Sequence, residues 1–328
     1  MKNNETILVT GGGGFLGCIL TKKLIDSGYR VVILDNFLFG THPLKFLLNL
    51  NKNNNLSVIF GDIRNEDELK RALHGVNAVI HLAAIVGDPI CAAHAELAVD
   101  VNFNATIKLG SLCKSKGIQK FIFASTCSVY GESGDEILTE NSKVNPISLY
   151  AETRFYAENG ILSLADQQFS PVILRLGTLF GLSPRMRFDI IINYFCLKAI
   201  LDEKIKIFGG DQWRPVLHLE DASSGFLKVL EAPLDTVKNH IFNLASTNIK
   251  INGLGELFSS MFPNIEIELK ENIKDKRSYR VSSEKIKKML NFNPSKTIEE
   301  GIIEIKESIE NKTIKDPTDK IYYNYYEF

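Results

Sequence analysis

The chain has 328 residues, of which 45% are hydrophobic and 23% charged, a composition that excludes disordered, collagen-like and coiled-coil proteins. Lysine and arginine number 38 against 39 aspartates and glutamates, and this near-neutral balance argues against nucleic acid as the main partner, since phosphate binding needs surplus cations. At roughly 150 residues per domain, the length suits two domains, or one large domain with an added lobe.

The first half of the chain alternates short β-branched runs with longer amphipathic segments. We expect strands at Ile7–Thr10, Val31–Asp35, Leu56–Phe60, Ala78–Leu82, Lys120–Ser125 and Pro171–Leu176, and helices at Phe15–Ser27, Glu66–Leu73, Glu96–Lys116 and Tyr150–Gln168. Apolar strands that alternate with helices are typical of a parallel sheet covered on both faces. The sequence therefore predicts an α/β fold with a doubly wound parallel sheet, a Rossmann domain.

The pattern becomes less regular after about Gly177. Helices are expected at Arg187–Ile200, Asp221–Glu231, Gly253–Met261, Ser282–Leu290 and Ile298–Ile309, and strands at Ile205–Phe208 and Pro215–Leu217. We predict that residues 1–176 form the Rossmann domain, with 215–244 returning to it, and that 177–214 and 245–328 form a smaller C-terminal substrate-binding lobe. The aromatic tail, Tyr322–Phe328, is expected to pack against this protein or against a second copy.

A glycine-rich turn joins the first predicted strand to the first helix. It fits G-x-G-x-x-G from Gly12 and G-x-x-G-x-x-G from Gly11, both ending at Gly17. Such glycines let backbone N–H groups approach a pyrophosphate at the helix N-terminus. Asp35 ends the second strand, where its carboxylate can bind a ribose diol and repel a 2′-phosphate, which favours NAD over NADP. The predicted cofactor contacts here are Gly11, Gly14, Phe15, Leu16, Gly17, Asp35 and Asn36.

The next two strands end in residues that suit the same cofactor. Asp62 and Ile63 follow the third strand, where a carboxylate can meet the adenine amino group, and Leu82, Ala83 and Ala84 follow the fourth, where small residues let the backbone approach. Doubly wound sheets bind ligands at the carboxyl ends of their strands. These residues are therefore predicted to bind NAD as well.

A possible hydride-transfer site follows the fifth strand. Tyr150 and Arg154 are four residues apart and share one helix face. A tyrosine with a pKa near 10 is a poor acid–base group at neutral pH, and a neighbouring cation lowers that pKa. Thr126, at the strand end, can orient the reacting oxygen of a substrate. Spacing alone leaves open that Tyr150 merely packs.

The whole chain resembles the extended short-chain dehydrogenase/reductase family, in its NAD-dependent nucleotide-sugar epimerase, dehydratase and reductase branch. The matching residues are Thr10–Gly17, Asp35–Asn36, Gly61–Arg64, His81–Ala84, Asn102, Ser125–Gly131, Tyr150–Arg154, Arg175–Gly181, Trp213–Asp221 and Arg277–Val281. The resemblance implies NAD, a nucleoside-diphosphate sugar as substrate, Tyr150 as acid–base and Thr126 as the hydroxyl. It also implies a homodimer, formed through two helices, the one predicted at Glu96–Lys116 and the one that begins at Tyr150.

One catalytic position departs from the family pattern. The family has lysine four residues after the tyrosine, whereas this chain has Arg154. Arginine keeps the charge and can donate to ribose hydroxyls, so Arg154 is predicted both to contact the cofactor and to act in catalysis. It does not, however, give up its proton. Two interpretations follow: a working enzyme, or a catalytically weak NAD-binding homologue with a sensing or scaffold role.

Two absences narrow the reaction that the resemblance implies. Family 4,6-dehydratases carry Asp-Glu after the catalytic threonine, and this chain has Cys127-Ser128 there. Members that epimerise at C3 and C5 have a histidine soon after the strand that holds Arg175, and Gly181–Pro184 lacks one. Oxidoreduction at C4 remains, as 4-epimerase, 4-dehydrogenase or 4-keto reductase.

Several residues are predicted to bind the nucleotide sugar. Arginine is scarce beside lysine, and guanidinium groups suit a diphosphate. Arg214 resembles the family's diphosphate-binding strand, and Arg277 its late nucleotide contact. The predicted substrate contacts are Thr126, Cys127, Arg185, Arg187, Arg214 and Arg277.

The five cysteines are scattered, without the paired spacing of metal ligands. They predict reduced thiols in a cytoplasmic protein and no metal site. We find no apolar run near the ~18 residues of a membrane span. The first residues enter a strand pattern at once, so no signal peptide is expected either.

Overall fold

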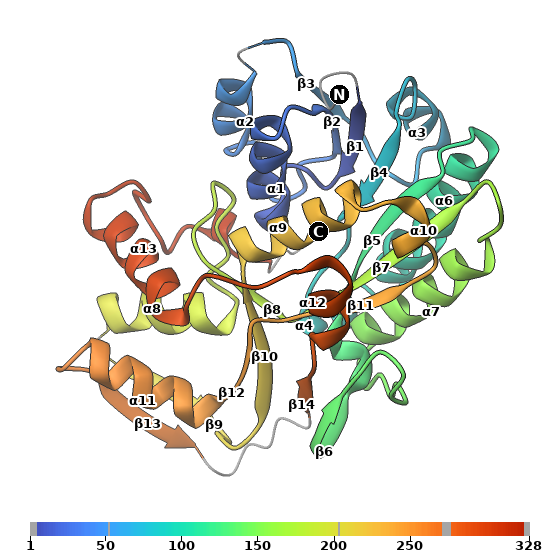
Figure 1. Cartoon of the computed structure of the whole chain (residues 1–328). Helices are drawn as coiled ribbons and strands as arrows, with labels where there is room; N and C mark the ends of the chain where they lie inside the picture. The colour runs from blue at the N-terminus through green and yellow to red at the C-terminus, as the bar shows by residue number, and fades with distance from the viewer. Residues whose placement is uncertain (1–4, 52, 203, 271–276, 325–328) are drawn as a thin grey trace.

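The computed structural model describes residues 5–51, 53–202, 204–270 and 277–324. Its centre is a seven-stranded sheet in the order β11-β7-β5-β4-β1-β2-β3 (Figure 1), with all neighbouring strands parallel. Its strands are β1 (Thr6–Thr10), β2 (Arg30–Asp35), β3 (Leu56–Phe60), β4 (Ala78–His81), β5 (Lys120–Thr126), β7 (Ser170–Leu176) and β11 (Ile241–Leu244). The strand order reverses between β1 and β4, so the predicted doubly wound α/β fold is confirmed, and a ligand crevice is expected at this reversal.

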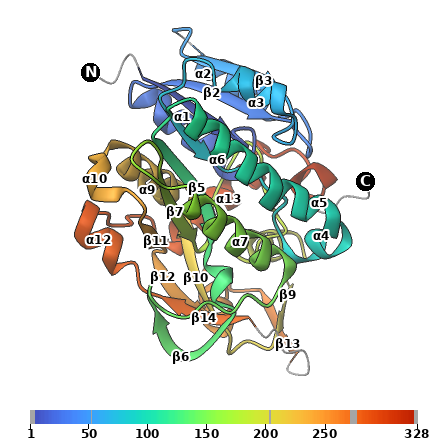
Figure 2. The ribbon, with the colours of Figure 1, turned by 90° about the vertical axis from the view of Figure 1, so that its right-hand side faces the viewer.

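Helices cover both faces of this sheet. α1 (Phe15–Asp26) packs against α2 (Leu44–Leu50) and α9 (Leu219–Glu231) on one face, and α6 (Ala105–Ser115) packs against α3 (Glu66–Ala72) and α7 (Leu149–Ser163) on the other. Figure 2 looks onto α6 and α7. Strand β1 shows why two cores form: Ile7 and Val9 enter one apolar cluster and Leu8 the other. A strand buried on both faces reads as a continuous apolar run.

The helix predicted at Glu96–Lys116 is interrupted. The structure has α4 (Asp88–Ala93), α5 (Ala95–Val99), a π-helical turn η2 (Asp100–Asn104) and then α6. The buried Asn102 side chain accepts from Ile85 N at 2.8 Å and donates to Ile85 O at 3.0 Å. The π turn therefore contains the residue that ties this segment to the chain after β4. Single π-helical turns are frequent at functional sites.

The predicted helix at Tyr150–Gln168 ends early, at Ser163. The Asp166 carboxylate accepts from the backbone N–H groups of Gln168 and Phe169, at 2.8 and 3.0 Å. Aspartate side chains that bond nearby backbone favour turns over helix. The chain therefore turns here and enters β7.

The second part of the chain builds smaller sheets. One has the order β12-β10-β8, and two others pair β13 with β9 and β14 with β6. The strands are β6 (Glu132–Leu138), β8 (Thr178–Phe180), β9 (Lys204–Phe208), β10 (Trp213–His218), β12 (Thr247–Lys250), β13 (Glu266–Lys270) and β14 (Ser278–Val281). The helices are α8 (Ile191–Leu201), α10 (Leu234–Val237), α11 (Ile251–Met261), α12 (Glu284–Leu290) and α13 (Ile298–Glu310), with short turns η3 (Cys127–Tyr130) and η4 (Lys320–Tyr322).

The segment predicted to return to the first domain is divided between the two parts. α9 packs on α1, and β11 lies at the edge of the large sheet. β10 instead pairs with β8 and β12 in the small sheet. The division into two domains stays a prediction. Within it, residues 213–218 belong with the lobe, because β10 is a strand of the small sheet.

The C-terminal segment packs on its own chain. The Tyr322 ring lies edge-on to Phe188 and to His42, with ring centroids 5.9 and 5.7 Å apart. The Tyr322 carbonyl accepts from Phe188 N at 2.9 Å. The rest of the predicted aromatic tail, 325–328, lies outside the described residues. None of the helices in the described part of the chain combines the length and the apolar character that a membrane crossing requires.

Candidate functional site

One cavity of about 1010 Å³ lies at the carboxyl ends of the parallel strands and extends to the lobe. It contains the switch point between β1 and β4. Every predicted cofactor, catalytic and substrate residue except Cys127 lines it: Gly11, Gly14, Phe15, Leu16, Gly17, Asp35, Asn36, Asp62, Ile63, Leu82, Ala83, Ala84, Thr126, Tyr150, Arg154, Arg185, Arg187, Arg214 and Arg277. Residues from Gly11 to Arg277, far apart in the chain, thus line one cavity.

The glycine turn fits the longer of its two possible motifs. Gly11 has φ +73°, and a Cβ there would lie 2.7 Å from Ala83 N. A Cβ on Gly17 would overlap the Gly11 carbonyl oxygen, whereas Gly12 faces Ile33 and is not among the cavity residues. The turn therefore brings its backbone against the chain after β4 and opens the N-terminus of α1 to the cavity, a position suited to a pyrophosphate.

Asp35 is held by the glycine turn itself. Its carboxylate accepts from Gly13 N at 2.8 Å and Phe37 N at 2.7 Å. Burial raises the pKa of Asp35, and the two backbone hydrogen bonds oppose the rise. Asp62, after β3, pairs with Arg64 at 2.7 Å; burial raises its pKa, but the bonds from Arg64 bring it below its usual range. Both carboxylates thus face the end of the cavity nearest β2 and β3.

Tyr150 and Arg154 lie on successive turns of α7. The Arg154 guanidinium is 1% exposed, lies 4.3 Å from the centroid of the Phe123 ring and donates to the Ala124 carbonyl. Its Nε and Nη1 atoms are buried without a hydrogen-bond partner among the described residues. Burial raises the pKa of Tyr150, and the charge of Arg154 opposes that rise. The predicted lowering by the cation is present but is outweighed by burial.

A chain of hydroxyl groups lines the same cavity as Tyr150. Thr126 Oγ1 lies 3.1 Å from Ser128 Oγ, which lies 3.0 Å from the Tyr279 hydroxyl on β14. Sequence reasoning missed Ser128 and Tyr279. Ser128 had a signal, because it is two residues beyond Thr126 in the matched segment. Tyr279 lies in the matched segment Arg277–Val281 as well, but its place beside Ser128 depends on the tertiary structure, in which β14 pairs with β6.

Cys127 faces away from this cavity. Its thiol is 1% exposed and donates to the Arg175 carbonyl at 3.2 Å. The tight turn η3 directs Ser128 toward the cavity and Cys127 into the core. A substrate contact at this turn is therefore better assigned to Ser128.

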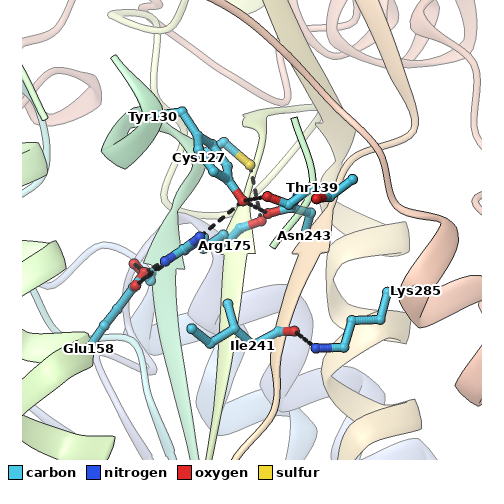
Figure 3. Close-up of polar contacts among 9 residues, drawn as sticks. Cys127, Tyr130, Thr139, Glu158, Arg175, Ile241, Asn243 and Lys285 are labelled. Atoms are coloured by element: carbon cyan, nitrogen blue, oxygen red, sulfur yellow. Dashed lines mark hydrogen bonds and ion pairs between the residues drawn. The ribbon is translucent and has the colours of Figure 1, made fainter. Parts of the chain in front are cut away.

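A buried polar network links β7 to α7, the helix that carries Tyr150 and Arg154 (Figure 3). Arg175 on β7 forms an ion pair with Glu158 on α7 at 2.7 Å, and Arg175 Nη1 donates to the Tyr130 hydroxyl at 3.0 Å. Tyr130 donates to Asn243 Oδ1 at 2.8 Å, and the Ser125 hydroxyl donates to Glu158. Glu158 is one turn after Arg154, so the network fixes the helix that carries Tyr150 and Arg154.

The arginines of the lobe differ in their partners. Arg187 pairs with Asp189 and Arg277 with Asp88, both at 2.5 Å. Arg214 donates to Trp213 O at 2.9 Å and to the Arg277 carbonyl. Arg185 donates to Met186 O at 3.0 Å and to Asn324 Oδ1 at 2.6 Å. The cavity therefore presents several positive groups to an anionic ligand.

The cysteines form no disulfide in the described segments, where all five are buried free thiols. In the same segments no group of three or more His, Cys, Asp or Glu side chains is placed to hold a metal ion.

Comparisons with known proteins agree on one family. The model of the NAD dependent epimerase/dehydratase family matches residues 7–245. The chain is 32% identical to UDP-glucuronate 4-epimerase of Thermodesulfobacterium geofontis, over 90% of this chain and 93% of that protein. It is 31% identical to a protein of Bacillus subtilis named uncharacterized UDP-glucose epimerase YtcB, over 90% and 95%.

Solved structures agree with these matches. UDP-glucuronic acid 4-epimerase from Bacillus cereus, in complex with UDP-glucuronic acid and NAD, superposes with a TM-score of 0.83 at 26% identity, over 93% of this chain and 99% of that one. UDP-glucose 4-epimerase from Thermotoga maritima, with UDP-glucose, gives 0.83 at 26%, over 94% and 99%.

Proposed function

Because the chain belongs to the NAD dependent epimerase/dehydratase family, as its resemblance predicted, we propose that it catalyses NAD-dependent oxidoreduction at C4 of a UDP-sugar, with 4-epimerisation as the net reaction. The observation that carries the proposal is the single cavity in which the glycine turn and Asp35 meet Tyr150, Thr126 and Arg154. Two relatives with such names cover nine-tenths of the chain. The proposal is therefore for an enzyme and not for a binding module.

The residues that line the cavity fit NAD. The cradle at Gly11 and Gly17 leaves no room for a Cβ, so the backbone stays open to a diphosphate. Asp35 presents a carboxylate to a ribose diol, and Asp62 lies beyond it for the adenine. The buried Nε and Nη1 of Arg154 are donors suited to the ribose hydroxyls at the other end of the cofactor.

Tyr150 is assigned as the acid–base group. When bound, NAD supplies the hydride acceptor and donor at its nicotinamide ring. Tyr150 takes the proton of the C4 hydroxyl as that carbon is oxidised and returns it on reduction, while Thr126 holds the same oxygen. The charge of Arg154 favours the phenolate against the effect of burial. Since arginine stays protonated, it acts as a fixed charge and takes no part in a proton relay.

The lobe supplies the substrate contacts. Arg187, Arg214 and Arg277 are assigned to the diphosphate of the sugar nucleotide, because guanidinium groups bind phosphate oxygens in pairs. Ser128 replaces Cys127 as the contact with the sugar. Neutral hydroxyls here favour epimerisation over loss of water, which needs an added acid and base.

The test is product analysis on freshly purified protein. NAD(H) is quantified after denaturation, and the protein is then incubated with UDP-glucose and UDP-glucuronic acid and the C4 epimers are separated. We expect retained NAD and a C4 epimer of one sugar, with Tyr150→Phe retaining NAD and losing at least 100-fold in turnover. A product two mass units lighter with NADH released would instead mean a dehydrogenase.

Arg154→Lys separates the enzyme from the catalytically weak homologue. The wild-type protein should turn over substrate, and the lysine variant should stay within ~10-fold of it, since both keep a cation near Tyr150. Retained NAD without turnover in either protein, and with either sugar, would favour the sensing or scaffold role.

We further propose a cytoplasmic homodimer, formed through the α5–α6 segment and α7. Val99 and Tyr156 are large apolar side chains left 37% and 58% exposed on these helices, and exposed apolar groups on neighbouring helices suit a second copy. Light scattering after gel filtration should give twice the mass of one chain, and Tyr156→Glu should halve it.

A further inference from the structure

Arg185 lies on the cofactor side of the cavity, although it belongs to the lobe. Its loop packs on the first turn of α1, where Ser183 Oγ donates to the Phe15 carbonyl at 2.8 Å. The guanidinium lies 4.5 Å from the centroid of the Phe39 ring, in the chain after β2. The residue is 3% exposed and lines the cavity. Its loop therefore lies beside the first turn of α1, and its guanidinium lies against the chain after β2.

The last described residues hold this guanidinium in place. Asn324 Oδ1 accepts from Arg185 Nη2 at 2.6 Å, and Asn324 Nδ2 donates to the Val86 carbonyl at 3.0 Å. Val86 follows β4. Ser183, Arg185 and Asn324 thus connect this loop to the chain after β1, the chain after β2 and the chain after β4.

The charge of Arg185 has no carboxylate partner within residues 5–324 as described, whereas Arg187 pairs with Asp189 and Arg277 with Asp88. Burial and the charge of Arg187 lower the pKa of Arg185 to about 9, although the charges of Asp189 and Asp35 oppose that shift. A buried cation is unfavourable unless an anion compensates it. Asp189 and Asp35 compensate this cation only in part, so the site favours a negatively charged ligand.

We infer that Arg185, positioned by Asn324, binds the diphosphate of NAD and not that of the sugar nucleotide. A dinucleotide places its diphosphate at the N-terminus of the first helix, which is where the Arg185 loop packs on Phe15. Arg187, two residues on, pairs with Asp189 and acts on the charge of Tyr150. Neighbouring arginines thus serve different ligands. The inference depends on the family's cofactor and is independent of the C4 chemistry proposed above.

Binding of diphosphate fragments tests this on the full chain. ADP-ribose, which lacks the nicotinamide, is titrated into cofactor-stripped protein saturated with UDP, and UDP is titrated separately. Arg185→Gln should weaken ADP-ribose binding roughly 10- to 100-fold, as expected for charge-assisted hydrogen bonds, and leave UDP binding within about threefold. Asn324→Ala should give a smaller loss of ADP-ribose. Purified Arg185→Gln should also retain less NAD per chain than the wild type.

Arg187→Gln is the matched control, and it should weaken UDP and spare ADP-ribose. Arg185→Lys keeps the charge and should recover part of the ADP-ribose affinity; it also serves if Arg185→Gln fails to fold. Loss of UDP binding alone in Arg185→Gln would assign the residue to the substrate and overturn the inference. Unchanged binding of both fragments would mean that another part of the chain neutralises Arg185, and would overturn it as well. Neither outcome depends on epimerase activity.

Discussion

Substitution of Glu158 tests the buried network that holds α7, the helix of Tyr150 and Arg154. Glu158→Gln keeps the shape of the side chain but leaves Arg175 without a counter-charge in a site where the two side chains are 1% and 4% exposed. Breaking a buried ion pair by removing one partner costs about 3–5 kcal/mol of unfolding free energy. Ser125 and Arg175 Nε also lose a charged acceptor. We therefore expect Glu158→Gln to lose about 3–5 kcal/mol of unfolding free energy, because both side chains of the pair are buried.

The double variant distinguishes a charge effect from a packing effect. Glu158→Leu with Arg175→Met removes both charges and fills a similar volume, and such replacements are often nearly neutral. We expect it to be more stable than Glu158→Gln, although Tyr130 loses the donor on Arg175. The exposed pair Lys22–Asp26, with side chains 51% and 57% exposed, is the control. Asp26→Asn should cost less than ~1 kcal/mol.

Equilibrium urea unfolding measures these differences. Far-ultraviolet circular dichroism follows the whole chain, and the fluorescence of the single tryptophan, Trp213, follows the small sheet. The reasoning would be refuted by a loss below 1 kcal/mol in Glu158→Gln, or by a double variant less stable than either single one. Coincident transitions with unchanged slopes are required for the comparison.

Three further outcomes are expected. Gly17→Ala should lose retained NAD by at least ~10-fold, because its Cβ would overlap the Gly11 carbonyl, while Gly253→Ala, whose nearest neighbour is 3.5 Å away, should retain the cofactor; equal NAD content would contradict the tight turn. Asp35→Ala should raise the affinity for NADP relative to NAD by ~10-fold or more in direct titrations, as a carboxylate there repels the 2′-phosphate; an unchanged ratio would exclude this role. Burial and the charge of Arg154 lower the pKa of His81 to about 3. Between pH ~6.5 and ~3 the unfolded state then binds one more proton than the folded state. The free energy of unfolding therefore decreases as the pH is lowered through that window, by about 2 kcal/mol from pH 7 to pH 5. His81→Gln should remove that part of the pH dependence in urea unfolding, and parallel profiles would show that His81 does not cause it.

The local pattern of the sequence was sufficient for the large sheet and for the cofactor end of the cavity. Buried parallel strands are apolar throughout, and the glycine turn must occur between a strand and a helix, so both leave a signal within a few residues. Gly11 to Gly17 and Asp35 could therefore be placed from spacing alone. Spacing also put Tyr150 and Arg154 on one helix face, but only the family resemblance implied a catalytic role for them.

Contacts between distant segments could only come from the tertiary structure. Tyr279 reaches Ser128 because β14 pairs with β6, and Asn324 reaches Arg185 across 139 positions. Nothing in the local periodicity of either segment encodes such a meeting. The sequence alone determined the fold class and the cofactor. The structure decided which side of the η3 turn faces the cavity and which partners each arginine has, since both depend on how separate elements pack.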